Sequence, residues 1–292
     1  MTGVSHDPDG DVYSLATADL VYRAVLGRPV DAGTRSALVE QLRSGHVDRT
    51  GLVASLAASR EFREAEAISR AARAARATSA AFTDIAEPND PSASERVIEI
   101  PWVLSRYAGE RRVVDVGTTN APAVYRELVG GLGIPELLSF DLAPCRDGAF
   151  CAVRADVRWL PLVAGSVDLV LCISTLEHVG RQNDRYGVTG GEGSDGDLRA
   201  LREIARVLRP GGRLLVSVPF GRHEDHGWFV QYDEATWDAL IGASGLRVVE
   251  EACFVSTRRR GWKRTGRSTT RRCSYEDGAT GASSVLCAAL VR

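Results

Sequence analysis

The sequence predicts an α/β fold, a doubly wound and mostly parallel sheet of seven strands, preceded by a small all-α domain. Short apolar runs typical of buried strands alternate with helical stretches from about residue 92 onward, and this alternation implies a parallel sheet. Residues 13–80 show helical periodicity instead. Polar residues follow four successive predicted strands, at the sheet edge where open α/β folds bind ligands.

The N-terminal segment contains the start and stop signals of several helices. Gly27 can end the first helix, and Asp31, Asp48 and Ser59 can cap the next three. We expect one stripe of the first helix to point into the core of this domain: Leu15, Leu20, Val21 and Val25.

The predicted boundaries follow these patterns. Residues 13–80 form the helical domain, 81–91 a linker that contains Glu87-Pro-Asn-Asp-Pro91, and 92–292 the α/β domain. Five strands are expected at residues 112–117, 137–141, 151–156, 167–174 and 213–219. Residues 246–255 and 284–291 are expected to add an antiparallel pair at the edge of the sheet.

Composition excludes several classes of protein. The net charge of −2 argues against a dedicated nucleic-acid binder, and no apolar run reaches the roughly 18 residues of a membrane span. The N-terminus lacks the features of a secretory signal, and the six cysteines show neither a CxxC pair nor zinc-like spacing. We therefore expect a cytoplasmic protein, and nothing in the sequence predicts its oligomeric state.

The residues at the strand ends are those that a nucleoside-containing ligand needs. Gly117 allows a tight turn after the first strand, and the next helix offers free N–H groups. Asp141, after the second strand, can accept the hydroxyl protons of a ribose. Asp156 follows the third strand and Ser174 the fourth.

Several motifs make the chain from about residue 92 to 292 resemble the class I S-adenosylmethionine-dependent methyltransferases, which have a Rossmann-like fold. They are Val-Asp-Val-Gly at 114–117, residues 156–161 followed by 166–171, Leu-Glu-His-Val at 176–179 and residues 206–212. The resemblance implies that Gly117 holds the methionine part of S-adenosylmethionine, Asp141 the ribose and Asp156 the adenine amino group. The predicted cofactor-binding residues are Asp115, Gly117, Thr118, Asn120, Asp141, Asp156, Val157 and Ser174.

The glycine turn departs from the family pattern. The second and third glycines are replaced by Thr119 and Ala121. A threonine in a left-handed conformation costs about 1 kcal/mol. Either the loop is reshaped, or its affinity for the cofactor is reduced.

Two looser resemblances concern the acceptor. Residues 177–187 and 219–229 resemble a bacterial subgroup associated with polysaccharide biosynthesis and sugar modification. Residues 22–28 and 59–62 are similar to the signature of a bacterial family of unknown function that accompanies glycan enzymes. Together they imply O-methylation of a sugar or glycan intermediate.

Two histidines are candidates for the base that an oxygen nucleophile needs. His178 follows the fourth strand and His226 lies in the loop after the fifth, although either can be a hydrogen-bonded structural histidine. The sequence His-Glu-Asp-His at 223–226 could ligate a metal ion, but adjacent ligands in a short loop fit poorly. We therefore expect no metal.

The segment 258–272 contains eight basic residues and no acidic one, which leaves the rest of the chain at −10. It is either a solvated loop, or a contact for phosphate on an activated or lipid-linked sugar, or for an anionic membrane surface. Nucleic acid is a less expected partner.

Two other functions compete with methyl transfer. A catalytically silent, methyltransferase-like binding module in a glycan-assembly system would explain the altered glycine turn. A nicotinamide-dependent oxidoreductase is disfavoured, because no G-x-G-x-x-G follows the first strand.

Overall fold

The computed structural model describes residues 8–78, 81–85, 89–143, 152–189, 193, 195–275 and 281–292. The chain forms two compact units, Met1–Ala67 and Ile68–Arg292, and each is described by itself. The boundary falls inside one helix, α4 (Arg60–Ala77). Among the described helices, none is long and apolar enough to cross a membrane.

The first unit contains α1 (Pro8–Leu26), α2 (Ala32–Arg43), α3 (Arg49–Ala57) and the start of α4. α1 packs against both α2 and α3. The three predicted caps are confirmed, because Asp31 accepts from the N–H of Thr34, Asp48 from that of Gly51 and Ser59 from that of Phe62. Gly27 follows α1 with a φ of 67°. The core residues are Ala18, Val21, Tyr22, Leu26, Val30, Leu38, Leu52 and Leu56.

The predicted apolar stripe of α1 was wrong at one position. Leu20 is 54% exposed, whereas its neighbour Val21 is 2% exposed. Val21 and Tyr22 are both buried and mark the direction of the core. Consecutive residues of a helix differ by about 100° in direction, so Leu20, which precedes Val21, points away from the face that Val21 and Tyr22 share.

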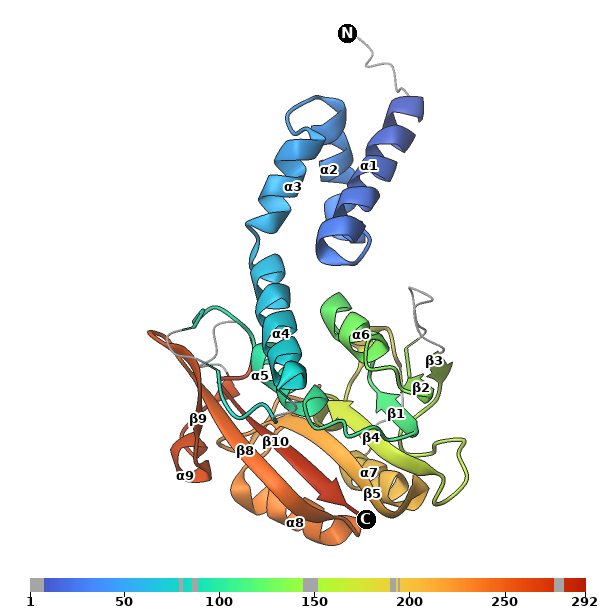
Figure 1. Ribbon diagram of the computed structural model, residues 1–292, viewed down its shortest axis with the longest axis vertical. Coiled ribbons are helices and arrows are strands. Elements are labelled where there is room, and N and C mark those ends of the chain that lie inside the picture. Colours follow the sequence, from blue (N-terminus) through green and yellow to red (C-terminus); the bar gives the residue numbers. More distant parts are fainter. Residues whose placement is uncertain are drawn as a thin grey trace. The chain divides into compact units, whose positions relative to one another are not determined.

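The second unit is built on one sheet of eight strands in the order β3-β2-β1-β4-β5-β10-β8-β9 (Figure 1). The first five neighbours in this order are parallel, while β10 is antiparallel to both β5 and β8, and β9 is antiparallel to β8. The bounds are β1 (Arg112–Val116), β2 (Glu136–Asp141), β3 (Ala152–Arg154), β4 (Val167–Ile173), β5 (Leu208–Pro219), β8 (Arg247–Thr257), β9 (Gly261–Thr265) and β10 (Ser284–Val291).

The seven predicted strands are present, and β9 adds an eighth. This strand lies inside the basic segment 258–272, where the sequence indicated a loop or a contact surface. Its Trp262 is 1% exposed and anchors the strand to the sheet. One buried tryptophan among basic residues gives too short an apolar pattern to predict a strand.

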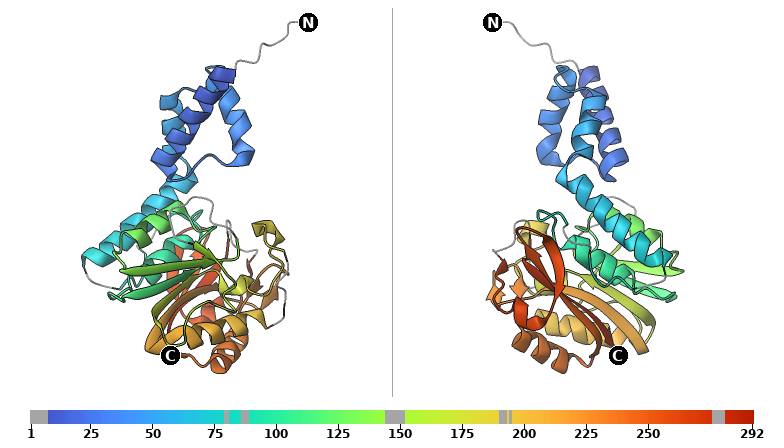
Figure 2. Two further views of the ribbon diagram at one scale, coloured as in Figure 1. Left: turned by 90° about the vertical axis from the view of Figure 1, so that its right-hand side faces the viewer. Right: turned by 60° about the vertical axis from the view of Figure 1, so that its left-hand side comes forward.

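Helices cover both faces of this sheet. α5 (Arg96–Leu104) and α6 (Ala123–Gly130) lie on one face, and α7 (Gly196–Val207) and α8 (Glu234–Ser244) on the other (Figures 1 and 2). Short elements follow β4 and β5 on their carboxyl side: η1 (Leu176–His178), η2 (Asp184–Tyr186), β6 (Glu224–Asp225) and β7 (Val230–Gln231). A further short helix, α9 (Arg267–Thr270), follows β9. Residues of β1, β4, β5 and β10 fill the core together with α7 and α8.

The described part of the predicted linker, residues 81–91, packs on this unit. Phe82 is 7% exposed. The N–H of Arg264 donates to Asp84 at 3.0 Å, and the N–H of Trp262 donates to Oδ1 of Asn89 at 2.8 Å. The Nδ2 group of Asn89 in turn donates to the carbonyl of Trp262 at 2.8 Å. These segments therefore lie along β9, and whether residues 13–80 fold independently stays a prediction.

Candidate active site

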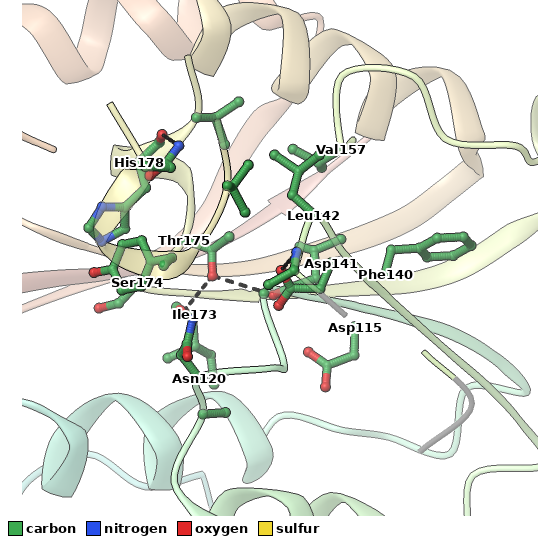
Figure 3. A pocket seen from close by; sticks show the side chains of 18 of the residues that line it. Asp115, Asn120, Phe140, Asp141, Leu142, Val157, Ile173, Ser174, Thr175 and His178 are labelled. Carbon is green, nitrogen blue, oxygen red and sulfur yellow. Dashed lines mark hydrogen bonds between the residues drawn. The ribbon is translucent and has the colours of Figure 1, made fainter. Parts of the chain in front are cut away.

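A pocket opens at the carboxyl ends of β1, β2 and β4, where the strand order reverses as in other ligand-binding α/β sheets. It encloses about 1150 Å³, including its open mouth. Eight of the ten residues predicted from sequence line it: Asp115, Gly117, Asn120, Asp141, Asp156, Val157, Ser174 and His178 (Figure 3). Thr118 and His226 are not among the lining residues.

Asp115 is a buried acid with one unused oxygen. Its Oδ1 accepts from the hydroxyl of Tyr125 at 2.8 Å, and its Oδ2 has no hydrogen-bond partner among the described residues. Burial raises the pKa of Asp115 to about 7. A buried carboxylate oxygen that lacks a donor suits a ligand that brings a positively charged one.

The turn after β1 needs its glycine. Gly117 has a φ of 84°, and a Cβ at this position would lie 2.1 Å from Oγ1 of Thr175 at the end of β4. The next residue, Thr118, is 3% exposed and its hydroxyl has no partner among the described residues. Gly117 therefore lets the turn approach β4, while Thr118 points into the protein.

The two substituted glycine positions carry no backbone strain. Ser174 is the non-glycine residue with positive φ in the described part of the chain, so Thr119 and Ala121 lie outside the left-handed region. The N–H of Thr119 donates to Asp141 at 2.8 Å, which ties the turn to β2. Of the two alternatives for this loop, the structure has the reshaped one.

Asp141 is held at the end of β2 by backbone groups. Its Oδ2 accepts from Thr119, and its Oδ1 accepts from the N–H of Ala143 at 2.9 Å. Each oxygen retains a lone pair for another donor. Asp141 is therefore fixed and still able to accept hydroxyl protons.

Asp156 has a partner that the sequence did not indicate. Nη2 of Arg158 donates to its Oδ2 at 2.6 Å, and the N–H of Arg158 donates to Oδ1 at 2.9 Å. Arg158 is 8% exposed and also lines the pocket. This ion pair uses much of the acceptor capacity that the resemblance assigns to an adenine amino group. Val157 lines the pocket next to it, together with the apolar side chains of Phe140 and Leu142.

A chain of polar contacts joins β4 to α5. Ser174, with a φ of 39°, donates from its hydroxyl to Oε1 of Glu99 at 2.8 Å. Glu99 is fully buried and also accepts from Nη1 of Arg96 at 2.9 Å. Arg96 lines the pocket and brings a cation to it. Sequence reasoning missed Arg96, because one arginine near the start of a helix forms no motif.

His178 lines the pocket with a defined tautomer. Its Nδ1 lies 2.9 Å from the carbonyl oxygen of Trp228. A carbonyl can only accept, so Nδ1 carries the proton and Nε2 has the lone pair. Burial lowers the pKa of His178 to about 4, and its ring is stacked on that of Trp228 at 5.2 Å. The imidazole is therefore neutral at physiological pH.

The structure does not bring His226 to the pocket. Its ring is stacked on Phe229 with a centroid distance of 4.5 Å, and its Nε2 donates to Oε2 of Glu224 at 3.1 Å. Glu224 also accepts from Arg222, from the hydroxyl of Ser274 and from the N–H of Tyr275. We call Glu224 and these four donors the Glu224 cluster: Arg222, Glu224, His226, Ser274 and Tyr275. Burial raises the pKa of Glu224, but the donors outweigh it and hold this pKa at about 2.

Comparison with known proteins supports methyl transfer. A family model described as a methyltransferase domain matches residues 136–216, which run from β2 into β5. No curated protein sequence matches the chain.

Solved structures show distant likeness. An S-adenosylmethionine-dependent methyltransferase from Mesorhizobium loti is 16% identical, with 70% of this chain and 100% of that chain covered and a TM-score of 0.45. A methyltransferase from Archaeoglobus fulgidus is 14% identical, with coverages of 68% and 95% and a TM-score of 0.46. The 1,6-didemethyltoxoflavin-N1-methyltransferase of Burkholderia thailandensis, solved with S-adenosylhomocysteine, is 15% identical, with coverages of 94% and 90% and a TM-score of 0.43. At these values the likeness carries no argument of its own.

The family match covers β2, β3, β4 and part of β5 but not β1, and the pocket has a glycine turn after β1 and acids at the ends of β1, β2 and β3. Residues 136–216 of the α/β unit match a methyltransferase domain, which supports an enzyme that uses S-adenosylmethionine.

Proposed function

We propose that the enzyme transfers the methyl group to a hydroxyl of a sugar or glycan intermediate, with His178 as the base. One observation carries this proposal. His178 is neutral, the bond from its Nδ1 to Trp228 leaves the lone pair on Nε2, which lies 3.9 Å from Oε1 of the buried Glu177, and the residue lines the same pocket as Asp115 and Asp141.

The residues of the pocket fit the proposed cofactor. Its amino-acid end carries an ammonium and a carboxylate, which suit the unpartnered Oδ2 of Asp115 and the guanidinium of Arg96. Asp141 can accept from ribose hydroxyls, and the apolar side chains beside Val157 suit a flat base. Asp156 can contribute only the acceptor capacity that Arg158 leaves. When bound, S-adenosylmethionine supplies the electrophilic methyl group on a sulfonium.

The protein then has two tasks, alignment and proton removal. The acceptor oxygen would form a bond to the methyl carbon as the carbon–sulfur bond breaks and S-adenosylhomocysteine leaves, while the hydroxyl proton would move to Nε2 of His178. The Trp228 carbonyl keeps the opposite nitrogen protonated, so the ring presents the same atom in every cycle. A pKa of about 4 makes this base weak but unprotonated over the whole physiological range.

The sugar or glycan acceptor rests on the sequence resemblances of residues 177–187, 219–229 and the helical unit. The basic segment gives only limited support for a phosphate or membrane contact. Arg267 pairs with Glu251 and Asp238, and Arg271 pairs with Glu234, so part of its charge is neutralised internally. Arg258 and Arg259 remain exposed at the turn between β8 and β9, and we retain them as a candidate peripheral contact of a cytoplasmic enzyme.

A silent binding module is not favoured. Its main support was the altered glycine turn, and the backbone at Thr119 and Ala121 is unstrained.

The experiment is a labelled transfer assay. The enzyme is incubated with methyl-deuterated S-adenosylmethionine and a panel of sugar phosphates and sugar nucleotides, and the products are examined by mass spectrometry. We expect one member of the panel to gain one labelled methyl group, and fragmentation to place it on oxygen. Labelling on nitrogen or carbon, or labelling of non-sugar hydroxyl compounds alone, would overturn the proposal.

A further inference from the structure

We propose that Asn183, Arg185 and Tyr186 form the acceptor subsite, in which Arg185 binds an oxyanion carried by the sugar. This inference rests on the proposed function and deepens it, because it names the acceptor as an anionic sugar. The three residues lie on or next to η2, directly beside the base His178.

Asn183 presents a fixed and unused acceptor. Its Nδ2 group donates to the carbonyl oxygens of His178 and Arg181, each at 3.0 Å. These two carbonyls determine the orientation of the amide, since only its nitrogen can donate to them. Its Oδ1 is buried without a hydrogen-bond partner among the described residues, and Asn183 lines the pocket. A hydroxyl group of a ligand is the donor that such an oxygen lacks.

Arg185 presents a fixed cation. Its guanidinium carbon lies 3.6 Å from the centroid of the Trp228 ring, which holds it flat. No carboxylate of the described residues forms an ion pair with it, whereas Arg181 pairs with Asp225 at 2.7 Å. The same Trp228 ring is stacked on His178, so Arg185 lies one ring away from the base. Its charge contributes to the lowered pKa of His178, in agreement with this proximity.

Tyr186 is the third residue of the proposed subsite. It lines the pocket, and its ring meets His178 edge-on with a centroid distance of 5.4 Å. The two arginines among the lining residues have carboxylate partners, Arg96 in Glu99 and Arg158 in Asp156. Arg185 is exposed and is not a lining residue, and on the Trp228 ring beside His178 it offers an anion a guanidinium that has no carboxylate partner among the described residues.

The combination selects a class of ligand. Asn183 suits a hydroxyl, and a guanidinium fork suits the paired oxygens of a phosphate or a carboxylate. A sugar phosphate and a uronic acid both offer a hydroxyl and an oxyanion on one small molecule. The shared chemistry is an anionic sugar, and the experiment distinguishes its two sources.

In the test, the full chain is titrated with glucose 1-phosphate, with glucuronate and with glucose. Ligand-observed NMR measures the affinity for each sugar. Each titration is run with and without saturating S-adenosylhomocysteine. We expect at least one anionic sugar to bind more tightly than glucose, and Arg185→Gln to weaken it by roughly 10- to 100-fold while glucose binding stays unchanged. Arg185→Lys keeps the charge without the fork, so its loss should be smaller. Asn183→Ala should weaken all three sugars alike.

The matched control is Arg247→Gln, which removes an exposed arginine at the start of β8. Unchanged thermal unfolding and S-adenosylhomocysteine affinity of Arg185→Gln identify its loss as local. The inference is overturned if glucose binds as tightly as both anions, if no sugar binds, or if Arg247→Gln rather than Arg185→Gln removes the anion. Failure of the wild type to bind S-adenosylhomocysteine would instead count against the proposed function. The sugar titrations without S-adenosylhomocysteine would still test the acceptor subsite.

Discussion

The pocket and the Glu224 cluster contain the same kinds of side chain, but they differ in how completely these are bonded. Glu224 accepts from Arg222, His226, Ser274 and Tyr275, so both of its oxygens are used. In the pocket, Oδ2 of Asp115 and Oδ1 of Asn183 are buried without partners among the described residues. The two regions therefore differ in their unused acceptors, and at the pocket wall such acceptors suit the donors of a ligand.

The two candidate bases illustrate this difference. Both histidines follow strands of the sheet and give the same signal in the sequence. His178 retains a free nitrogen at the pocket, while the Nε2 of His226 is bonded to Glu224 away from it. Substitutions in the pocket should therefore change binding and rate, and substitutions in the Glu224 cluster should change stability.

The largest expected effect is on the rate of methyl transfer. His178→Ala should slow single-turnover transfer by roughly 10²–10⁴-fold at saturating cofactor, because the acceptor hydroxyl loses its base. His226→Ala is the matched control and should transfer at the wild-type rate once corrected for the folded fraction. Equal rates in the wild type and His178→Ala would remove the base from our proposal, and a slow His226→Ala enzyme would break the comparison.

The next effect is a pH dependence of cofactor binding. Only ionised Asp115 can pair with an ammonium, and its pKa is raised to about 7 in the free enzyme. Affinity for S-adenosylhomocysteine should be highest above pH 7 and fall as the pH is lowered, by about tenfold per unit and about 100-fold at pH 5.

Calorimetry from pH 5 to 8 in two buffers measures both this affinity and the release of one proton on binding at low pH. Asp115→Asn should bind weakly and without this slope, while Asp141→Asn should keep the slope. A flat profile in the wild type would show that Asp115 does not meet the ammonium.

A third effect concerns the ribose. Asp141→Ala should weaken S-adenosylhomocysteine by roughly 1–3 kcal/mol, because two hydroxyl donors lose their acceptor. Asp141 also holds the N–H groups of Thr119 and Ala143, so its removal loosens the turn as well. Comparison with 2′-deoxyribose and 3′-deoxyribose analogues by calorimetry separates these causes. If the variant loses as much affinity for the analogues as for the natural ligand, Asp141 acts on the turn alone.

The smallest effect on binding is expected in the Glu224 cluster. Glu224→Gln should lower the free energy of unfolding by about 1–3 kcal/mol at neutral pH and leave cofactor affinity unchanged. The pKa of Glu224 is lowered to about 2, so its stabilisation is present above pH 4.5 and is lost as the pH falls through 2. Urea denaturation of both proteins should therefore converge toward pH 2. A difference that persists there would trace the loss to packing.

Most of the fold could be predicted because the buried positions of helices and strands carry apolar residues at regular spacing. The apolar runs of β1, β4 and β5 indicated buried parallel strands, and the acids at the ends of β1, β2 and β3 indicated where ligands bind. β9 could not be predicted, since its buried residues are Gly261 and Trp262 and the tryptophan is its one apolar side chain among basic neighbours. The stripe of α1 was wrong at Leu20 because the pattern does not fix the width of the face that the core can accept.

The pocket residues at the ends of strands could be predicted from the sequence, whereas the contacts made by its loop residues could not. Gly117, Asp141 and Ser174 follow strands directly, so their order in the chain fixes their place. The pairing of Asp156 with Arg158 and the free oxygen of Asn183 depend on loop conformation, which no periodicity encodes. The same holds for the stacking of Arg185 on Trp228.

The contacts of Asp84 and Asn89 with β9 have a consequence for solubility. β9 is the last strand in the sheet order, and a bare edge of this kind invites strand pairing between molecules. Asp84 and Asn89 occupy the N–H groups of Arg264 and Trp262, and the amide of Asn89 also takes the carbonyl of Trp262. We therefore expect residues 81–91 to oppose the pairing of β9 with a strand of another molecule. A truncated protein that begins at residue 92 would lose these bonds, and it should self-associate at concentrations at which one that begins at residue 81 stays monodisperse.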